Sequence, residues 1–178
     1  MNLNSDIEIN LVKATDAWKI CNFIVSNEDR FKTYLPETLA QNLTPTLSEL
    51  FVKQKLKFIQ AEEEFLYTIK STLKRDLIGL AYVKQIDLQK RQVEFAYAID
   101  YKYTGQGIIP FTIKQLISNF KDRYHIKTFQ IVVNKDNNPS IRVAEKNGFQ
   151  WIKTLPEIFK PKGRPPMDME LYELQLEQ

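Results

Sequence analysis

Residues 92–120 constrain the fold of this chain most, because a strand pattern meets a helix pattern there at a turn with two glycines. Residues 93–99 are rich in the β-branched and aromatic side chains that favour strands. Beyond the turn, apolar side chains recur at the three- and four-residue spacing of an amphipathic helix, at Ile109, Ile113, Leu116, Ile117 and Phe120. The segment is therefore predicted to form a strand, a tight turn and a helix.

Pro110 indicates where this helix begins. A proline has no backbone N–H, so it is tolerated in the first turn of a helix and excluded from later turns. The helix must then start at about Gly107 or Ile108. Several N–H groups point into one small volume at such a start, and the macrodipole adds about half a positive charge. This arrangement predicts a site for phosphate.

Length and charge limit the class of protein. The 178 residues suffice for one full hydrophobic core, so we expect one domain over residues 1–178. Hydrophobic residues at 43% and charged residues at 26% are ordinary for a folded protein and do not indicate disorder. The 25 Lys and Arg residues exceed the 22 Asp and Glu residues by only three and are dispersed along the chain. We therefore expect no nucleic-acid partner.

The single cysteine and the single histidine narrow the chemistry. Cys21 lies in the apolar pattern of the first helix, which suggests a buried thiol, and His125 lies in a polar turn, which suggests a surface residue. Zinc chemistry and a Ser-His-Asp triad are both poorly supported, so we expect no metal. The first residues have no signal-peptide pattern, and no apolar run approaches the roughly 20 residues that span a membrane. These features predict a cytoplasmic protein.

The first half of the chain reads as strands and helices in the order strand, helix, irregular segment, helix and three strands. The predicted ranges are a strand at 7–11, a helix at 15–26, a helix at 46–61 and strands at 65–70, 76–86 and 91–101. Thr46 and Glu49 have the spacing of a capping box for the second helix. Short polar turns between the three strands predict an antiparallel meander. Gly79 predicts a bulge or a close backbone approach.

Residues 27–45 have no clear period, and two interpretations stay open. The segment is a loop or broken helix over a site, or it is a solvated connection whose aromatic side chains, Phe31 and Tyr34, pack on the core.

The second half of the chain begins with a strand that we expect to run parallel to the strand at 91–101. Residues 127–133 form a short, largely apolar run, which a right-handed crossover would place parallel to the strand at 91–101. Asn138 is predicted to cap the next helix, which ends at Gly148. Two strands follow at 149–154 and 169–176, separated by a loop at 155–168 that is too rich in proline for regular structure. The fold class is therefore α/β, with a mixed sheet of six to seven strands and about four helices.

Two sequence motifs, taken together, indicate one protein family. The first is Lys102-Tyr103-Thr104-Gly105-Gln106-Gly107, which follows the strand residues Glu94, Phe95, Ala96, Tyr97, Ala98 and Ile99. The second consists of Asn137, Ser140, Ile141, Arg142, Val143, Glu145, Lys146, Gly148 and Phe149. With these motifs and this order of elements, the chain resembles the GNAT-type N-acetyltransferases, specifically their RimJ/RimL-like branch. The second motif is the more specific of the two.

The resemblance implies a single GNAT-like domain whose sheet is largely antiparallel with one splayed parallel pair. Acetyl-CoA would lie between the strands at 91–101 and 127–133. The implied cofactor-binding residues are Tyr97, Ala98, Ile99, Lys102, Tyr103, Thr104, Gly105, Gln106, Gly107, Ile108, Asn137 and Ser140. Lys102 stands where the family usually has Gln or Arg, and Pro110 is unusual in the pyrophosphate helix. Ala144 stands where many members have a tyrosine acid, so Ser140 becomes the replacement candidate.

Glu94 is the candidate general base. Alternation along the strand places Glu94, Ala96 and Ala98 on one face, where the small alanines leave space beside the carboxylate. The alternative is a solvated or ion-paired strand residue. Tyr97, on the other face, is interpreted as core and as a wall of the acyl pocket rather than as an acid.

Asn137 and Ser140 are the other catalytic candidates, with Ser140 protonating the leaving thiolate. The alternative is a capped helix in which Ser140 is an ordinary first-turn residue. A backbone N–H near residues 97–99 would stabilise the developing oxyanion.

The resemblance predicts transfer of acetyl to a primary amine by direct attack in a ternary complex. A protein N-terminal α-amine is favoured, while a small amine or an aminoglycoside stays open. A non-catalytic acyl-CoA-binding or regulatory module is the rival class, and a homodimer is left open. Lys160, Lys162 and Arg164 form a positive patch, interpreted as a solvated loop, as a contact for an acidic acceptor or as a contact for the CoA 3′-phosphate. Trp18 and Trp151 are interpreted as core or rim packing.

Overall fold

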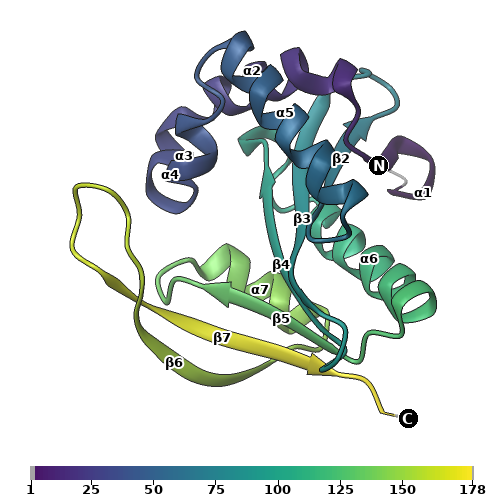
Figure 1. Ribbon diagram of the computed structural model, residues 1–178, viewed down its shortest axis with the longest axis vertical. Coiled ribbons are helices and arrows are strands. Elements are labelled where there is room, and N and C mark those ends of the chain that lie inside the picture. The colour runs from purple at the N-terminus through teal and green to yellow at the C-terminus, as the bar shows by residue number, and fades with distance from the viewer. Residues whose placement is uncertain (1–2, 178) are drawn as a thin grey trace. The chain divides into compact units, whose positions relative to one another are not determined.

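The computed structural model describes residues 3–177 and has a mixed α/β fold (Figure 1). Its seven strands are hydrogen-bonded in the order β1-β2-β3-β4-β5-β7-β6, as the α/β prediction required. The strands are β1 (Ile7–Leu11), β2 (Phe65–Ser71), β3 (Leu77–Asp87), β4 (Gln92–Ile99), β5 (Thr128–Val133), β6 (Gln150–Phe159) and β7 (Met167–Gln175). The helices are α1 (Leu3–Asp6), α2 (Ala17–Ser26), α3 (Glu28–Tyr34), α4 (Pro36–Ala40), α5 (Pro45–Gln60), α6 (Ile108–Tyr124) and α7 (Asn138–Lys146), with 3₁₀ turns η1 (Ala14–Asp16) and η2 (Tyr101–Tyr103).

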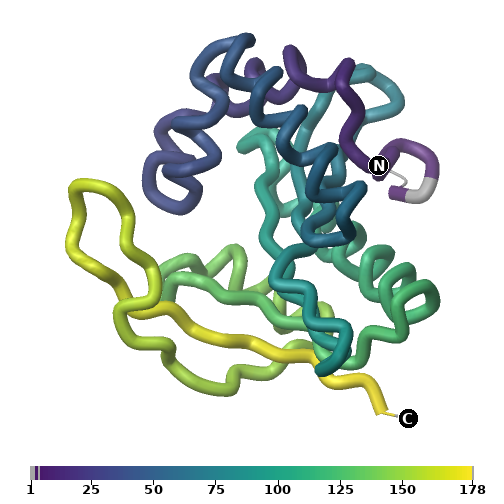
Figure 2. Tube along the Cα trace, in the orientation of Figure 1, coloured from purple at the N-terminus to yellow at the C-terminus, as the bar shows by residue number. Residues whose placement is uncertain are grey.

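The described residues form two compact units. Unit 1 contains residues 3–82 and 97–108, and unit 2 contains residues 83–96 and 109–177. The chain passes from one unit to the other within β3, within β4 and just after α6 begins. Figure 2 follows this path along the Cα trace.

Unit 1 is built on the antiparallel pair β1 and β2, whose register runs from Ile7↔Ser71 to Leu11↔Tyr67. Helices α2 and α5 contact each other, and α5 also contacts β2. Their buried side chains repeat at helical spacing because an amphipathic helix turns one stripe to the core. Fully or almost fully buried members of this core are Ile20, Ile24, Phe51, Val52, Leu66 and Ile69. The predicted first strand and first helix are confirmed.

The segment at residues 27–45 is a broken helix, formed by α3 and α4. Phe31 is buried, and its ring lies 5.4 Å from that of Phe23 on α2. Tyr34 is 43% exposed. One of the two aromatic side chains therefore packs on the core and the other does not.

The predicted capping box of α5 is wrong. The N-cap is Thr44, whose Oγ1 accepts a hydrogen bond from the Leu47 N–H at 3.3 Å. Pro45 occupies the first helical position, which suits a residue without an N–H, so the cap falls on the residue before it. Thr46 and Glu49 are thus inside the helix, and sequence spacing alone placed the start two residues late.

Gly79 of β3 permits the close backbone approach that its sequence position predicted. A Cβ atom at this position would lie 2.7 Å from the backbone oxygen of Ala98 on β4. No side chain fits at that distance, so only glycine allows the strands to approach here.

Unit 2 contains the parallel pair that the crossover rule predicted. Strand β4 pairs in parallel with β5 from Gln92↔Thr128 to Phe95↔Ile131, and α6 lies between them in the chain. Strand β5 then pairs antiparallel with β7, and β7 with β6. The rings of Phe95 and Phe129 stack with their centroids 5.5 Å apart. The predicted splay of the parallel pair stays a prediction.

Pro110 lies in the first turn of α6, and the helix begins at Ile108 as predicted. Its buried apolar stripe is Ile109, Ile113, Leu116 and Phe120. Helix α7 ends at Lys146, and Gly148, with a φ of +82°, follows its C-cap Asn147 as predicted. Its N-cap, however, is Asn137 and not Asn138, because the Asn137 side chain is the one that accepts the hydrogen bond from Ser140.

The predicted loop at 155–168 is shorter than expected, because β6 continues to Phe159 and β7 begins at Met167. Strand β6 is last in the strand order, and an outermost strand tolerates Pro156, whose missing N–H need not face a neighbour. Glu157, with a φ of +50°, lies in a register shift between Leu155 and Phe159. The prolines therefore accompany irregular pairing between β6 and β7, and the prediction of a loop over all of residues 155–168 is wrong.

Within residues 3–177, no helix combines the length and the apolar character that a bilayer-spanning helix needs.

Candidate functional site

The turn before α6 has the geometry of an anion site. Gly105 and Gly107 have φ values of +80° and +79°, a region that glycine adopts without steric cost. Within the described chain, the N–H groups of Gly105, Gln106 and Gly107 have no hydrogen-bond acceptor. A Cβ atom built at Gly105 would meet nothing within 4 Å. Three unpaired donors at the start of a 17-residue helix fit a phosphate group.

Most hydrogen bonds of the predicted residues just before this turn are made by backbone groups. The Lys102 N–H donates to Asp100 Oδ1 at 2.8 Å, and the Tyr103 N–H donates to the Asp100 carbonyl at 2.9 Å. Gln106 Nε2 donates to the Lys102 carbonyl at 2.9 Å. The side chains of Lys102, Thr104 and Gln106 are exposed. The Lys102 ammonium lies over the Tyr101 ring, 5.4 Å from its centroid.

Asn27 and Arg30 contact the end of β4, and the sequence did not predict a role for them. Asn27 is 3% exposed. Its Oδ1 accepts from the Tyr101 N–H at 3.1 Å, and its Nδ2 donates to the Phe23 carbonyl at 2.9 Å and to Asp100 Oδ2 at 3.4 Å. Arg30 donates to the Ile99 carbonyl at 3.2 Å. The residues in these contacts lie about 70 positions apart in the chain. No periodic pattern connects the two segments, so the sequence gives no sign that they meet.

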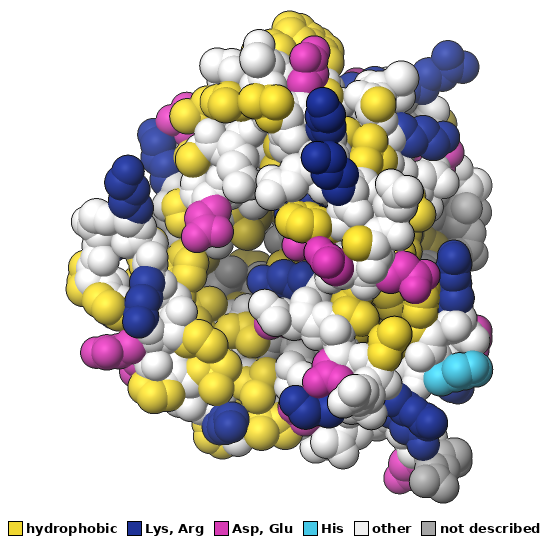
Figure 3. Space-filling model, in the orientation of Figure 1, with side chains coloured by type: hydrophobic (Ala, Val, Ile, Leu, Met, Phe, Trp, Pro, Cys, Tyr) yellow, Lys and Arg dark blue, Asp and Glu magenta, His cyan; other side chains and the backbone are white. Residues whose placement is uncertain are grey.

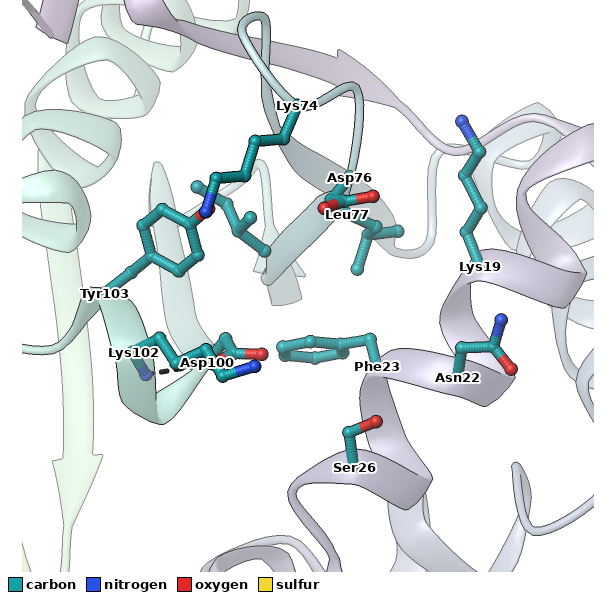
Figure 4. Close-up of a pocket in the computed structure, with 11 residues that line it drawn as sticks. Lys19, Asn22, Phe23, Ser26, Lys74, Asp76, Leu77, Asp100, Lys102 and Tyr103 are labelled. Carbon is teal, nitrogen blue, oxygen red and sulfur yellow. Dashed lines mark hydrogen bonds between the residues drawn. The ribbon is translucent and has the colours of Figure 1, made fainter.

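A cavity of about 230 Å³ in unit 1 lies beside η2 (Figure 4). Helix α2, the turn between β2 and β3, and η2 supply its walls. Its charged lining consists of Lys19, Lys74, Asp76, Asp100 and Lys102. Figure 4 shows Lys74 and Tyr103 on one side of the space and Lys19 and Asn22 on the other. Of the predicted site residues, the cavity wall contains only Lys102 and Tyr103.

Glu94 lies on β4 in unit 2 and forms an ion pair. Its carboxylate is 3.0 Å from the Lys84 ammonium, with 15% of the Glu94 side chain and 37% of the Lys84 side chain exposed. Burial alternates along the strand, since Val93 and Phe95 are buried whereas Glu94 and Ala96 are half-buried. The predicted alternation therefore holds as far as Ala96, and the ion-paired state named as the alternative is present.

The alternation ends after Ala96. Tyr97 is half-buried and Ala98 is buried, the reverse of what strict alternation required. Tyr97 is thus not a core residue. Ile99, the last residue of β4, is half-buried.

A row of polar side chains crosses three strands on the same face as Glu94. Gln92 Nε2 donates to Gln130 Oε1 at 2.9 Å, and Gln130 Nε2 donates to Glu173 Oε2 at 2.6 Å. Glu94 is in register with Gln130, and Gln130 with Glu173, so their side chains share one face of the sheet. This half-buried face therefore has two carboxylates, of which Glu94 is paired with Lys84 and Glu173 accepts from Gln130.

Asn137 and Ser140 lie together at the start of α7, just beyond the end of β5. Asn137 Oδ1 accepts from the Ser140 N–H at 3.4 Å, and the Asn137 carbonyl accepts from the same group at 3.0 Å. Both residues are half-buried. Asn137 is therefore a helix cap, and among the described residues its Nδ2 has no acceptor.

The other residues considered from the sequence differ in their exposure. His125 is exposed, and Cys21 is buried, as predicted. Trp18 and Trp151 are 60% and 56% exposed, so neither is a core residue. On β6, Ile152 and Ile158 are exposed as well. Figure 3 shows hydrophobic side chains at the surface of one face of the molecule. The patch residues Lys160, Lys162 and Arg164 are all exposed. Residues 3–177 contain no group of three His, Cys, Asp or Glu side chains suited to a metal ion.

Comparison with known proteins adds a family and a fold. The sequence profile of the acetyltransferase (GNAT) domain matches residues 7–150. The ribosomal-protein-serine acetyltransferase of Escherichia coli (strain K12) is 26% identical over 135 residues, which cover 62% of this chain and 75% of the relative.

Two solved structures are similar over nearly their full length. The microcin C7 self-immunity acetyltransferase MccE, in complex with acetyl-CoA and AMP, has a TM-score of 0.90 at 22% identity, covering 99% of this chain and 96% of that chain. The ribosomal L7/L12 α-N-protein acetyltransferase RimL, in complex with coenzyme A, has a TM-score of 0.89 at 17% identity, covering 97% and 95%. At these identities the structures establish a shared fold.

Proposed function

Because the chain belongs to the acetyltransferase (GNAT) domain family, we propose that it acetylates the N-terminal α-amine of a protein by direct attack in a ternary complex. Membership makes it an acetyl-CoA-dependent N-acetyltransferase with an amine acceptor. The protein acceptor is proposed from similarity to the ribosomal-protein-serine acetyltransferase. The matched residues 7–150 include parts of both compact units, which supports one domain over residues 1–178.

The observation that carries the cofactor assignment is the set of unpaired N–H groups in the turn at Gly105, Gln106 and Gly107. We assign the pyrophosphate of acetyl-CoA to these donors. The exposed ammonium of Lys102, three residues before Gly105, would add positive charge near the same site. Bound there, acetyl-CoA supplies an activated acetyl thioester. Strand residues Tyr97, Ala98 and Ile99 would contact the pantetheine, and Tyr103, Thr104 and Ile108 would complete the turn.

Glu94 is proposed to accept the proton of the acceptor amine, directly or through water. Its face of unit 2 is half-buried, and Ala96 leaves space beside it. The Lys84 ion pair holds the carboxylate in one position. An N-terminal α-amine has an ordinary pKa of about 7.7 to 8, so a fraction of it is already neutral near pH 7 and needs only modest assistance.

Ser140 is proposed to return a proton to the departing thiolate. It lies in the first turn of α7, where the partial positive charge of the helix favours a developing anion. Asn137 keeps this turn in place through its cap and has a free Nδ2 donor for the thioester region. Backbone N–H groups at residues 97–99 are the proposed donors to the carbonyl oxygen.

An acceptor panel tests the proposal. Purified protein is mixed with acetyl-CoA and with peptides that have a free N-terminus, the same peptides with a blocked N-terminus and an internal lysine, polyamines or aminoglycosides, and thiol release is followed. The proposal predicts turnover that requires the free N-terminus. Turnover only with polyamines or aminoglycosides would assign a small amine as acceptor instead. A cytoplasmic location, which the buried free thiol of Cys21 supports, is part of the same proposal.

A further inference from the structure

We infer that Asn27 and Asp100 act as positioning residues for acetyl-CoA, because their hydrogen bonds fix the backbone that leads into the phosphate turn. The inference rests on the proposed placement of the pyrophosphate at residues 105–107. Neither residue belongs to the two sequence motifs, and neither is placed to touch the reacting atoms.

The contacts form a continuous chain from α2 to the turn. Asn27 lies directly after α2 and accepts from the Tyr101 N–H at 3.1 Å. Asp100 accepts from the Lys102 N–H at 2.8 Å, and its own N–H donates to the Ile78 carbonyl of β3 at 2.8 Å. The Lys102 carbonyl accepts from Gln106 at 2.9 Å. Each bond leads one step closer to Gly107.

Packing does little to hold this segment. The side chains of Tyr101, Lys102, Thr104 and Gln106 are exposed, and the cavity of about 230 Å³ lies against Asp100, Lys102 and Tyr103. A backbone with open space behind it and exposed side chains in front is stabilised chiefly by its hydrogen bonds. Loss of those bonds should therefore change the conformation of the turn more than the stability of the fold.

The polarity of the Asn27 amide is fixed by its surroundings. Its oxygen must face the Tyr101 N–H, and its nitrogen must face the Phe23 carbonyl and Asp100 Oδ2. Both oxygens of Asp100 are also occupied, one by Lys102 and one by Asn27. A carboxylate at position 27 would face a second carboxylate, so the pair is specific for one amide and one acid.

The first test is Asn27→Ala, with acetyl-CoA affinity measured by calorimetry and the KM for acetyl-CoA measured separately from kcat. If the competent turn falls to about a tenth of the population, the apparent Kd for acetyl-CoA rises about tenfold. Asn27→Asp should weaken binding at least as much. Unchanged affinity in both variants, with only a lower Tm, would assign Asn27 to stability and overturn the inference.

Asn42→Ala is the matched control. Asn42 is also fully buried, donates to the carbonyl four residues earlier, and accepts from Ser48 Oγ at 2.8 Å. Within residues 3–177 the Asn42 side chain makes no hydrogen bond with η2 or the turn, so its loss should lower Tm without changing acetyl-CoA affinity. Equal losses of affinity in Asn42→Ala and Asn27→Ala would show a general effect of destabilisation and contradict the inference.

A double variant that exchanges the two side chains tests whether acetyl-CoA affinity can be restored. In Asn27→Asp/Asp100→Asn, the new carboxylate accepts from Tyr101 and from the new amide, and the new amide oxygen accepts from Lys102. The bond to the Phe23 carbonyl is lost, and a carboxylate oxygen then faces this carbonyl oxygen, so the recovery should be partial. Acetyl-CoA affinity should recover relative to either single variant, and a double-mutant cycle without coupling would count against the pair.

Gly107→Val separates this inference from the function on which it rests. If Gly107→Val leaves acetyl-CoA affinity unchanged, the phosphate turn itself is misassigned and the inference falls with it. If Gly107→Val weakens binding while the Asn27 variants do not, the turn assignment stands and only the positioning role is refuted.

Discussion

Replacement of Gly105 by alanine tests the phosphate turn without a steric clash. The φ of Gly105 is +80°, and a Cβ atom there meets nothing within 4 Å. Gly163, in the loop between β6 and β7, has a φ of +76° and equally open surroundings. The two positions therefore differ in their proposed contact with the cofactor and hardly at all in backbone strain. Gly163→Ala is the matched control.

Gly105→Ala and Gly163→Ala should lose similar stability but should differ in their affinity for CoA. A left-handed backbone costs an L-residue about 1 to 2 kcal/mol, so both variants should lose a similar amount of unfolding free energy. Relief of the strain at residue 105 would turn its N–H away from the pyrophosphate. A hydrogen bond to a charged group contributes about 1.5 to 3 kcal/mol, which corresponds to a weakening of CoA binding by about 10- to 100-fold. Gly163→Ala should bind CoA as the unaltered protein does.

Calorimetric titration with CoA and thermal unfolding of both variants provide the two measurements. Equal CoA affinity in Gly105→Ala and Gly163→Ala, alongside equal losses of stability, would refute the assignment of the pyrophosphate to this turn.

Three further predictions concern single side chains. Glu94→Gln should lower kcat and steepen its dependence on pH, because only an already neutral amine then reacts; an unchanged pH–rate profile would remove Glu94 as base. Asn137→Asp keeps the cap of α7 but removes the Nδ2 donor, so its Tm should be retained while its activity falls, whereas Asn137→Ala should also lose about 1 kcal/mol of stability. Burial raises the pKa of Tyr82, and the nearby Thr38 side chain only partly opposes this rise. Within residues 3–177, no atom lies in good hydrogen-bond geometry with the Tyr82 hydroxyl. The neutral phenol therefore stabilises the fold below its ordinary pKa of about 10, and this contribution is lost as the pH rises further. Tyr82→Phe should cost little at neutral pH and should flatten the alkaline loss of stability seen by chemical denaturation; an identical alkaline loss would contradict this account.

Local chemistry explains which parts of the fold were predictable. Pro110 limits the helix start to the residues just before it, and Gly79 marks a place where Ala98 leaves no room for a side chain. Both features could therefore be predicted from single residues. The parallel pairing of β4 with β5 followed from the connecting helix. Where two residues could fulfil one role, sequence spacing chose wrongly: Thr44 and Asn137 are the caps, one or two residues before the predicted positions.

The candidate site was predictable only where a motif is continuous in the chain. The turn at residues 102–108 is local, and its geometry agrees with the prediction. Asn27 and Arg30 contact the end of β4 from a segment without any period, so no sequence pattern could connect them. The Glu94–Lys84 ion pair likewise depends on which residues face each other across a sheet. Burial of Ala98 in place of Tyr97 reflects a departure from alternation that side-chain types do not encode.

The position of the transferred acetyl group tests the central claim most directly. A peptide with a free N-terminus and an internal lysine is incubated with the protein and acetyl-CoA, and fragment-ion mass spectrometry locates the added acetyl group. The account predicts the acetyl group on the N-terminal nitrogen. An acetyl group on the lysine side chain alone would contradict the proposed acceptor, and an unmodified peptide in the presence of bound CoA would contradict acetyl transfer to this class of amine.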